Sequence, residues 1–206
     1  MGHASFCTIP LATYRRLWLL YLIERFHDAC YGAVRLQKVA FFSEVGEQQR
    51  PFPFRKAPFG PYSEELRETL EQLLSMQLVE AESMGEEGNR YRARICQGTD
   101  CPYGRWLESI SPSAKVAIDR ACSRYGYRKQ QDILDAGHQV EGFADAQAFE
   151  TILDTDMGSR VRVSLDEDEC EDLAISLSPK FARLIQGLSE TDWVSDLDKV
   201  QLVDAG

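Results

Sequence analysis

The chain has 206 residues, of which 44% are hydrophobic, 10% aromatic and 27% charged. This composition is typical of a globular protein that buries a core, and it excludes a disordered chain, a collagen-like fibre and a small disulfide-stapled module. The net charge of −10 argues against nucleic acid or anionic lipid as a partner, because binding either one requires local positive charge.

The negative charge is concentrated at one end of the chain. Residues 1–140 carry 18 basic and 17 acidic side chains, a net of +1, whereas residues 141–206 carry 5 and 16, a net of −11. This asymmetry predicts a nearly neutral helical domain over residues 1–140 and an acidic, partner-binding extension over residues 141–206. The sequence leaves open whether the extension folds alone or only on a partner.

Three segments in the first half of the chain have helical periodicity. Apolar residues recur at spacings of three and four over residues 11–28, which predicts a helix with one buried stripe. A second helix is expected over residues 33–45, with Gly46 as its C-terminal cap. A third, rich in leucine, follows the favourable N-cap residue Ser63.

Between the second and third helices, residues 50–62 are rich in proline and aromatic residues. Three prolines within eight residues exclude a helix or a central strand, so we expect a long loop. Over residues 78–95 an acidic arm and an arginine-rich arm predict a β-hairpin. Two further helices are expected over residues 112–125, with Ser111 as N-cap, and over residues 127–137.

The extension has a pattern of its own. We expect a helix over residues 143–153 and a strand over residues 160–165, where polar and apolar residues alternate. An acidic run over residues 166–169 then opens a helix that is interrupted at Pro179, and the last fifteen residues form an acidic tail. The expected fold is therefore mainly α with a small β-hairpin, a winged-helix-like helical core and an α/β C-terminal extension.

The order helix, helix, loop, helix, hairpin is that of a winged-helix domain, and its third helix tests a DNA-binding role. A helix that reads the major groove needs basic or amide side chains and no carboxylates facing the phosphates. Here the only basic residue is Arg67, among four glutamates: Glu64, Glu65, Glu68 and Glu71. The sequence therefore disfavours DNA as a partner.

Two basic clusters lie outside that helix. They consist of Arg50, Arg55 and Lys56, and of Arg120, Arg124, Arg128 and Lys129. We interpret them as solvated surface; the alternative is that they dock an acidic partner or the acidic tail of the chain itself.

No catalytic motif or cofactor fingerprint is present, so the sequence predicts neither an enzyme nor a cofactor. Of the six cysteines only Cys96 and Cys101 are close together, and no second pair of ligands follows them. We therefore expect free thiols rather than zinc. A cytoplasmic location is expected because no apolar run has the roughly 18 residues of a membrane span and the N-terminus lacks the features of a signal peptide.

The proline-rich segment is the main candidate for function. Its aromatic residues, Phe52, Phe54, Phe59 and Tyr62, exceed what local packing in a loop can use. They predict a rigid docking surface of the kind that is enriched at protein interfaces. A structural lid over the helical core, with Gly60 in a conformation that other residues avoid, is the alternative, and the two are compatible.

Two motifs together resemble a known family. The helix segment 35–42 contains Leu-Gln-Lys, and residues 59–63 read Phe-Gly-Pro-Tyr-Ser, followed by a leucine-spaced helix. Over about residues 10–140 this pattern resembles the Panacea antitoxin domain, a family that includes SocA-like and phage-associated proteins. The chain departs from the pattern at Val39-Ala40, in a cysteine-containing insertion over residues 96–106 and in the acidic extension.

The resemblance implies a non-catalytic antitoxin of a toxin–antitoxin system, which binds and neutralises a cognate toxin or effector protein by direct contact. The acidic run adds a way to attract a basic toxin. The alternatives are a winged-helix transcriptional regulator and a phage antirepressor or proteolytic adaptor; the oligomeric state stays open. The candidate partner-binding residues are Gln37, Lys38, Arg55, Phe59, Gly60, Pro61, Tyr62, Asp166, Glu167, Asp168 and Glu169.

Overall fold

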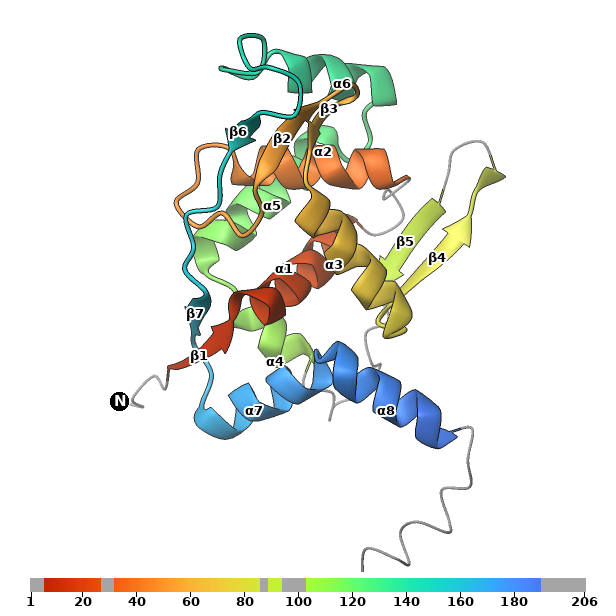
Figure 1. Ribbon diagram of the computed structural model, residues 1–206, viewed down its shortest axis with the longest axis vertical. Coiled ribbons are helices and arrows are strands. Elements are labelled where there is room, and N and C mark those ends of the chain that lie inside the picture. The colour runs from red at the N-terminus through yellow and green to blue at the C-terminus, as the bar shows by residue number, and fades with distance from the viewer. Residues whose placement is uncertain (1–5, 27–31, 86–88, 94–102, 190–206) are drawn as a thin grey trace, which may run out of the picture.

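The fold is mixed α/β (Figure 1) and was obtained as a computed structural model, which describes residues 6–26, 32–85, 89–93 and 103–189. The eight helices within these residues are α1 (Leu11–Phe26), α2 (Ala33–Glu44), α3 (Glu64–Ser75), α4 (Tyr103–Glu108), α5 (Pro112–Tyr125), α6 (Gln130–His138), α7 (Glu167–Ser176) and α8 (Pro179–Ser189). The strands are β1 (Cys7–Pro10), β2 (Phe54–Ala57), β3 (Gly60–Tyr62), β4 (Val79–Ser83), β5 (Asn89–Ala93), β6 (Thr151–Leu153) and β7 (Arg160–Val163).

Helix α1 forms the centre of the core. It lies between α3 and α5 and also contacts α4, β1, β5 and β7 (Figure 1). Residues on all sides of it are buried, including Leu17, Trp18 and Leu22. The buried surface is therefore wider than the single stripe that the periodicity predicts, because neighbours surround the helix.

Most helix boundaries agree with the capping residues in the sequence. The Ser63 hydroxyl accepts a hydrogen bond from the Leu66 N–H at 3.2 Å, and Ser111 does the same for Ala114 at 3.3 Å. The C-cap of α2 is Val45 rather than the expected Gly46, which follows it with a φ of +82°. The predicted N-caps and the predicted break before Pro179 are confirmed.

The predicted hairpin is also confirmed, as the two-stranded sheet of β4 and β5. Its register places Glu80 opposite Arg92 and Glu82 opposite Arg90, and the latter pair approaches to 3.8 Å. Opposite charges thus face each other across the strands, as the acidic and arginine-rich arms predict. The fold nevertheless contains more β-structure than one hairpin, because two further antiparallel sheets are present.

The expectation of a loop over residues 50–62 is wrong in its central part. β2 is the middle strand of a three-stranded sheet with the order β3-β2-β6. Four residues fit between Pro53 and Pro58, so β2 itself contains no proline. Pro61 lies in β3, at the edge of the sheet, where a missing N–H donor costs no ladder hydrogen bond.

The helix predicted over residues 143–153 is also wrong. Turns occupy residues 141–146, and the chain then enters β6, which pairs with β2. Phe149 has a φ of +66°, a conformation that a right-handed helix cannot contain. Its N–H donates to the Lys56 carbonyl at 2.8 Å, so contact with β2 determines the local structure.

Residues beyond 140 share two sheets with the preceding part of the chain. β6 pairs with β2, and β7 pairs with β1 in a register that places Cys7 opposite Val163. A disulfide joins Cys7 to Cys170 at the start of α7, with 6.5 Å between the Cα atoms. The expectation of free thiols is therefore wrong for these two residues, which are 163 positions apart and are brought together by strand pairing.

Cys30, Cys96, Cys101 and the acidic tail over the last fifteen residues lie outside the described residues. Within the part of the chain that is described, no helix combines the length and the apolar character needed to cross a bilayer.

Candidate partner-binding site

The two motifs that carry the family resemblance meet in the structure. The Gln37 amide nitrogen donates to the Ser63 carbonyl at 2.8 Å, and its amide oxygen accepts from the Ser63 N–H at 2.9 Å. Both residues are buried. A side chain of α2 thus satisfies both backbone groups of the N-cap residue of α3 and fixes where that helix begins.

Lys38 supports the next part of the motif. Its Nζ donates to the Pro61 carbonyl at 2.5 Å, and its side chain is buried. Burial away from water lowers the pKa of this ammonium group to about 8. Gly60 has a φ of +89°, and a Cβ there would lie 3.2 Å from Cε of Lys38. The position therefore requires glycine for both backbone and space.

Two of the four aromatic residues in this segment belong to the core. Phe52 and Phe54 are fully buried, and their rings meet Trp18 at 5.5 Å and Phe41 at 5.2 Å in edge-to-face contacts. For these two side chains the lid interpretation holds. Of the four aromatic side chains, only Phe59 and the half-buried Tyr62 can therefore contribute to a docking surface.

Phe59 lies in the turn between β2 and β3 and is 68% exposed. Beneath it is a cavity of about 190 Å³ between the hairpin, α2 and α3, which we call the Phe59 groove. Its volume is below the roughly 300 Å³ of small-molecule pockets, so it is suited to one inserted side chain. The groove is lined mainly by apolar parts of Val34, Lys38, Ala57, Phe59, Tyr62, Leu66 and Leu70.

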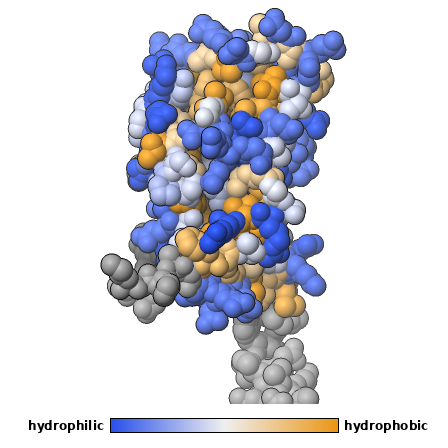
Figure 2. All heavy atoms as spheres, turned by 90° about the vertical axis from the view of Figure 1, so that its left-hand side faces the viewer, coloured by the Kyte–Doolittle hydropathy of each residue, from blue (hydrophilic) through white to orange (hydrophobic). Residues whose placement is uncertain are grey.

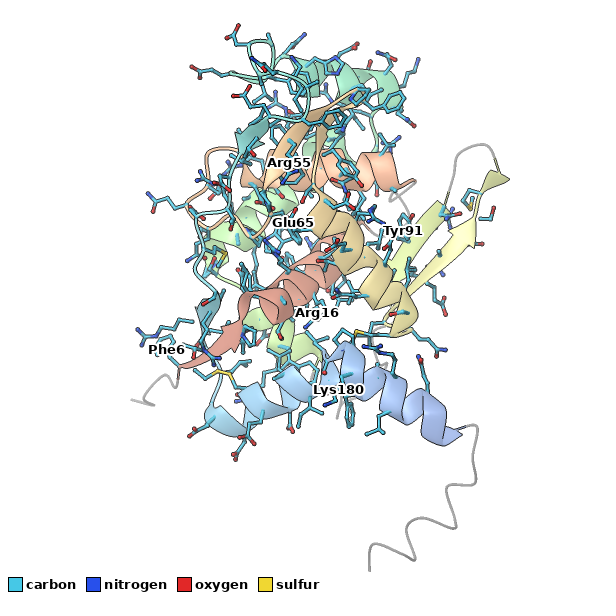
Figure 3. The ribbon with its side chains drawn as sticks, in the orientation of Figure 1. Phe6, Arg16, Arg55, Glu65, Tyr91 and Lys180 are labelled. Atoms are coloured by element: carbon cyan, nitrogen blue, oxygen red, sulfur yellow. A yellow bond between two sulfur atoms is a disulfide. The ribbon has the colours of Figure 1, made fainter. Side chains whose placement is uncertain are left out.

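The remaining predicted residues of this region have different exposures. Arg55 is exposed on β2, opposite Tyr62 in the strand register (Figure 3). The Tyr62 hydroxyl donates to Glu64 at 3.0 Å. Gly60 and Pro61 are buried. Arg55, Phe59 and Tyr62 are thus placed to touch a partner, whereas Gln37, Lys38, Gly60 and Pro61 hold them in position.

The second predicted group, Asp166–Glu169, is partly used inside the protein. Asp166 accepts from the Glu169 N–H at 2.8 Å and Glu169 accepts from the Asp166 N–H at 3.1 Å, which is a capping box at the start of α7. Glu169 also pairs with Arg105 at 2.5 Å. Only Glu167 and Asp168 are exposed, so two of the four carboxylates can meet a partner.

The structure does not bring the two predicted groups together. β2 and β3 lie at one end of the molecule and α7 at the other, with α1 between them (Figure 1). Figure 3 shows the same separation for the labelled residues Arg55 and Lys180. A partner that contacts Phe59 therefore approaches a different surface from one that contacts Glu167.

Several basic residues of α3 and of the first basic cluster form ion pairs or hydrogen bonds within the chain. On α3, Arg67 forms ion pairs with Glu64 and Glu71. In the first basic cluster, Arg50 pairs with Asp156 at 3.7 Å, and Lys56 donates to the carbonyls of residues 144 and 146. This cluster holds the acidic C-terminal part of the chain itself. The residues of the second cluster, on and after α5, are solvent-exposed.

Sequence reasoning missed a second apolar surface. Ile175, Phe181 and Leu184 are 47%, 39% and 58% exposed and line a cavity of about 830 Å³ where α7 meets α8, which we call the α7–α8 groove. The periodicity of the sequence predicts a helix in this region, but it does not show that no other described element packs over these apolar side chains. In the view of Figure 2, apolar residues emerge in patches separated by hydrophilic ones.

The described residues were compared with the requirements of a metal site and of a cysteine nucleophile. They contain no group of three or more His, Cys, Asp or Glu side chains that could hold a metal ion. The thiol of Cys122 is buried, which raises its pKa to about 12 and makes it a poor nucleophile. Comparison with protein-family models, curated proteins and solved structures gives no match.

Proposed function

We propose that this protein is a non-catalytic antitoxin that binds and neutralises a cognate toxin or effector protein, with Phe59 as the anchor of the interface. The observation that carries the proposal is the exposed Phe59 ring above a groove that accommodates one side chain. Exposed aromatic residues beside a small apolar depression are typical of binding hot spots. The motifs that resemble the Panacea family fix the backbone that directly follows the Phe59 turn.

The proposal includes a winged-helix-like core and a cytoplasmic location. The order α1, α2, α3, β4, β5, with the β2–β3 hairpin inserted between α2 and α3, supports a winged-helix-like core. We infer a cytoplasmic location, where disulfides are usually transient, so the Cys7–Cys170 bond would then be reversible. A transcriptional regulator is the weaker alternative, since both ion pairs of Arg67 are made to glutamates on its own helix.

The exposed acids Glu167 and Asp168 add an electrostatic contribution to this proposal. In the interaction with a basic toxin, they accelerate association rather than anchor the complex, because they are exposed and screened by salt. Truncation at residue 140 is a poor test of their role, since it would also remove β6, β7 and the Cys170 crosslink. Glu167→Lys with Asp168→Lys changes the charge and leaves the capping residues intact.

The test is co-expression with the protein encoded by the neighbouring open reading frame, scored by growth and by affinity of the purified pair. Phe59→Ala should lower the affinity by about 30-fold, as expected for a hot-spot aromatic residue. Tyr127→Ala is the matched control, because Tyr127 is 80% exposed and lies outside the groove. Equal neutralisation by the Phe59→Ala variant and the wild type would refute the proposed anchor.

A further inference from the structure

The α7–α8 groove is formed by one helix that packs on the core and a second helix whose described residues are half-buried or exposed. Leu173 of α7 and Leu177, the C-cap residue that follows it, are fully buried. Gln186 of α8 donates to the Ser75 carbonyl at the end of α3 at 2.9 Å. The helix α7 is therefore packed on the core, and α8 is connected to α7 and to the end of α3. Their outward side exposes Ile175, Phe181 and Leu184. These three apolar residues line one cavity, whereas apolar residues on a protein surface are usually scattered singly.

Charge is segregated between the two helices. α7 carries five acidic residues and no basic ones: Glu167, Asp168, Glu169, Glu171 and Asp172. α8 carries Lys180 and Arg183 and no acidic residue. Glu171 and Asp172 precede Ile175 by four and three positions, so they lie on the same side of α7 as this apolar residue.

The separation of charge between α7 and α8 indicates which kind of partner can bind in the groove. A uniformly basic partner would be repelled by Lys180 and Arg183 at the groove, and a uniformly acidic one by the carboxylates of α7. A second copy of the chain satisfies both helices at once. In a twofold arrangement, α7 of each copy faces α8 of the other, and the apolar side chains meet between them.

We propose that the α7–α8 groove is a self-association surface through which two copies of this chain form a twofold dimer. The interface is centred on Ile175, Phe181 and Leu184 and flanked by pairs between α7 carboxylates of one copy and Lys180 and Arg183 of the other. Each helix is only about 15 Å long. The contact is thus at the small end of the range for specific interfaces, and the dimer is expected to dissociate on the order of micromolar concentrations.

The first test is analytical ultracentrifugation of the full chain across a concentration series. Wild type should pass from monomer to dimer, and Leu184→Glu should weaken dimerisation at least tenfold, because a charge then replaces an apolar contact. Val116→Glu is the matched control, since Val116 is 55% exposed on α5, outside the groove. A wild-type chain that stays monomeric at several hundred micromolar would overturn the proposal.

A charge exchange tests the twofold arrangement itself. Glu171→Lys with Asp172→Lys makes both helices basic at the groove, and Lys180→Glu with Arg183→Glu makes both acidic. Each double variant alone should dimerise at least tenfold more weakly than wild type. Mixing the two should restore dimerisation, because each basic helix then faces an acidic one; a mixture that stays monomeric while wild type dimerises contradicts this geometry.

The α7–α8 groove and the β2–β3 hairpin that carries Phe59 lie at opposite ends of the molecule (Figure 1), so dimerisation does not depend on the proposed Phe59 anchor. Leu184→Glu should therefore weaken dimerisation and leave binding of the neighbouring-frame protein unchanged. If it lowers affinity for that protein and leaves self-association unaltered, the occupant is the partner, and the dimer is refuted. Loss of binding in the Phe59→Ala variant alone affects only the proposed function.

Discussion

The two ends of the molecule both expose apolar side chains, but they are held in place by different means. The hairpin that carries Phe59 is fixed by buried hydrogen bonds from Gln37 and Lys38 of α2. The α7–α8 end is attached through β7 and through the disulfide between Cys7 and Cys170. The first surface is organised by contacts within about thirty residues of sequence, whereas the second depends on contacts between the two ends of the chain.

This difference has a consequence for binding. A side chain that is already held in its bound position loses little conformational freedom when a partner docks. The backbone at Phe59 is restrained in this way, because buried hydrogen bonds from Lys38 and Gln37 hold Pro61 and Ser63, which directly follow its turn. The α7–α8 surface is held by one covalent bond, by strand pairing and by the buried Leu173 and Leu177, so part of its attachment depends on the state of that bond.

The largest expected effect is on the α7–α8 end. Cys170→Ser should lower the free energy of unfolding by about 4 kcal/mol relative to the oxidised wild type, because the crosslink closes a loop of 163 residues in the unfolded chain. Urea titration measures the loss, and hydrogen exchange should locate it in β1 and α7. The wild type treated with a dithiol reductant is the control and should match the variant; no response of the wild type to reductant would argue against the crosslink.

A somewhat smaller loss is expected at the Phe59 end. Gln37→Ala should lower the free energy of unfolding by about 3 kcal/mol, since it leaves the buried N–H and carbonyl of Ser63 without their partner. Amide exchange should accelerate at the start of α3 and not in α7. Gln131→Ala is the control, because the exposed Gln131 side chain bonds only to Asp135 on its own helix. Loss below about 1 kcal/mol would mean that the motif is not a structural anchor.

The smallest effect is a dependence on pH at the Phe59 end. Glu44 is buried, and its Oε2 accepts from the Phe52 N–H at 3.2 Å. Burial raises its pKa well above the usual value of 4.5, despite that hydrogen bond and the nearby Arg15 and Arg50. Between pH 4.5 and the native pKa the folded state binds more protons than the unfolded chain. The stability contributed by protonated Glu44 is therefore complete below pH 4.5 and is lost as pH rises.

Denaturation at a series of pH values tests this dependence. The contribution of Glu44 should lower the free energy of unfolding by at most about 1.4 kcal/mol per pH unit over that range. Glu44→Gln, which mimics the protonated form, should remove this slope. Glu68→Gln, at an exposed position of α3, should retain it. Identical slopes in the wild type and the Glu44→Gln variant would show that Glu44 does not cause the dependence.

Local signals were sufficient to predict most helices. Ser63, Ser111 and Asp166 each accept a backbone N–H at a helix start, and this chemistry is visible in a few residues of sequence. The β4–β5 hairpin was predictable for the same reason, because its two arms are adjacent. The predictions were wrong where contacts between distant residues determine the structure. These features are β2 as a central strand, β6 in place of a helix, and the Cys7–Cys170 bond.

The candidate site was predictable in part. Sequence identified the segment around Phe59 but could not separate the buried Phe52 and Phe54 from the exposed Phe59, because all three share a proline-rich environment. The acidic run at the start of α7 was identified as well. Its own capping box, which occupies Asp166 and Glu169, follows from the spacing of these residues and could have been anticipated. The exposure of Leu184 depends on which elements fail to cover α8 and has no local signal.

The pairing of β1 with β7 also governs the order of events during synthesis. Residues 7–10 leave the ribosome early, but their partner strand ends at Val163, so this sheet cannot form until most of the chain exists. At about 5–20 residues per second the delay is on the order of ten seconds. Throughout that interval the N-terminal segment and Cys7 have no strand partner, while α1, α2 and α3 have local partners. Long-range pairing of this kind slows folding, and it makes closure of the two chain ends one of the last steps.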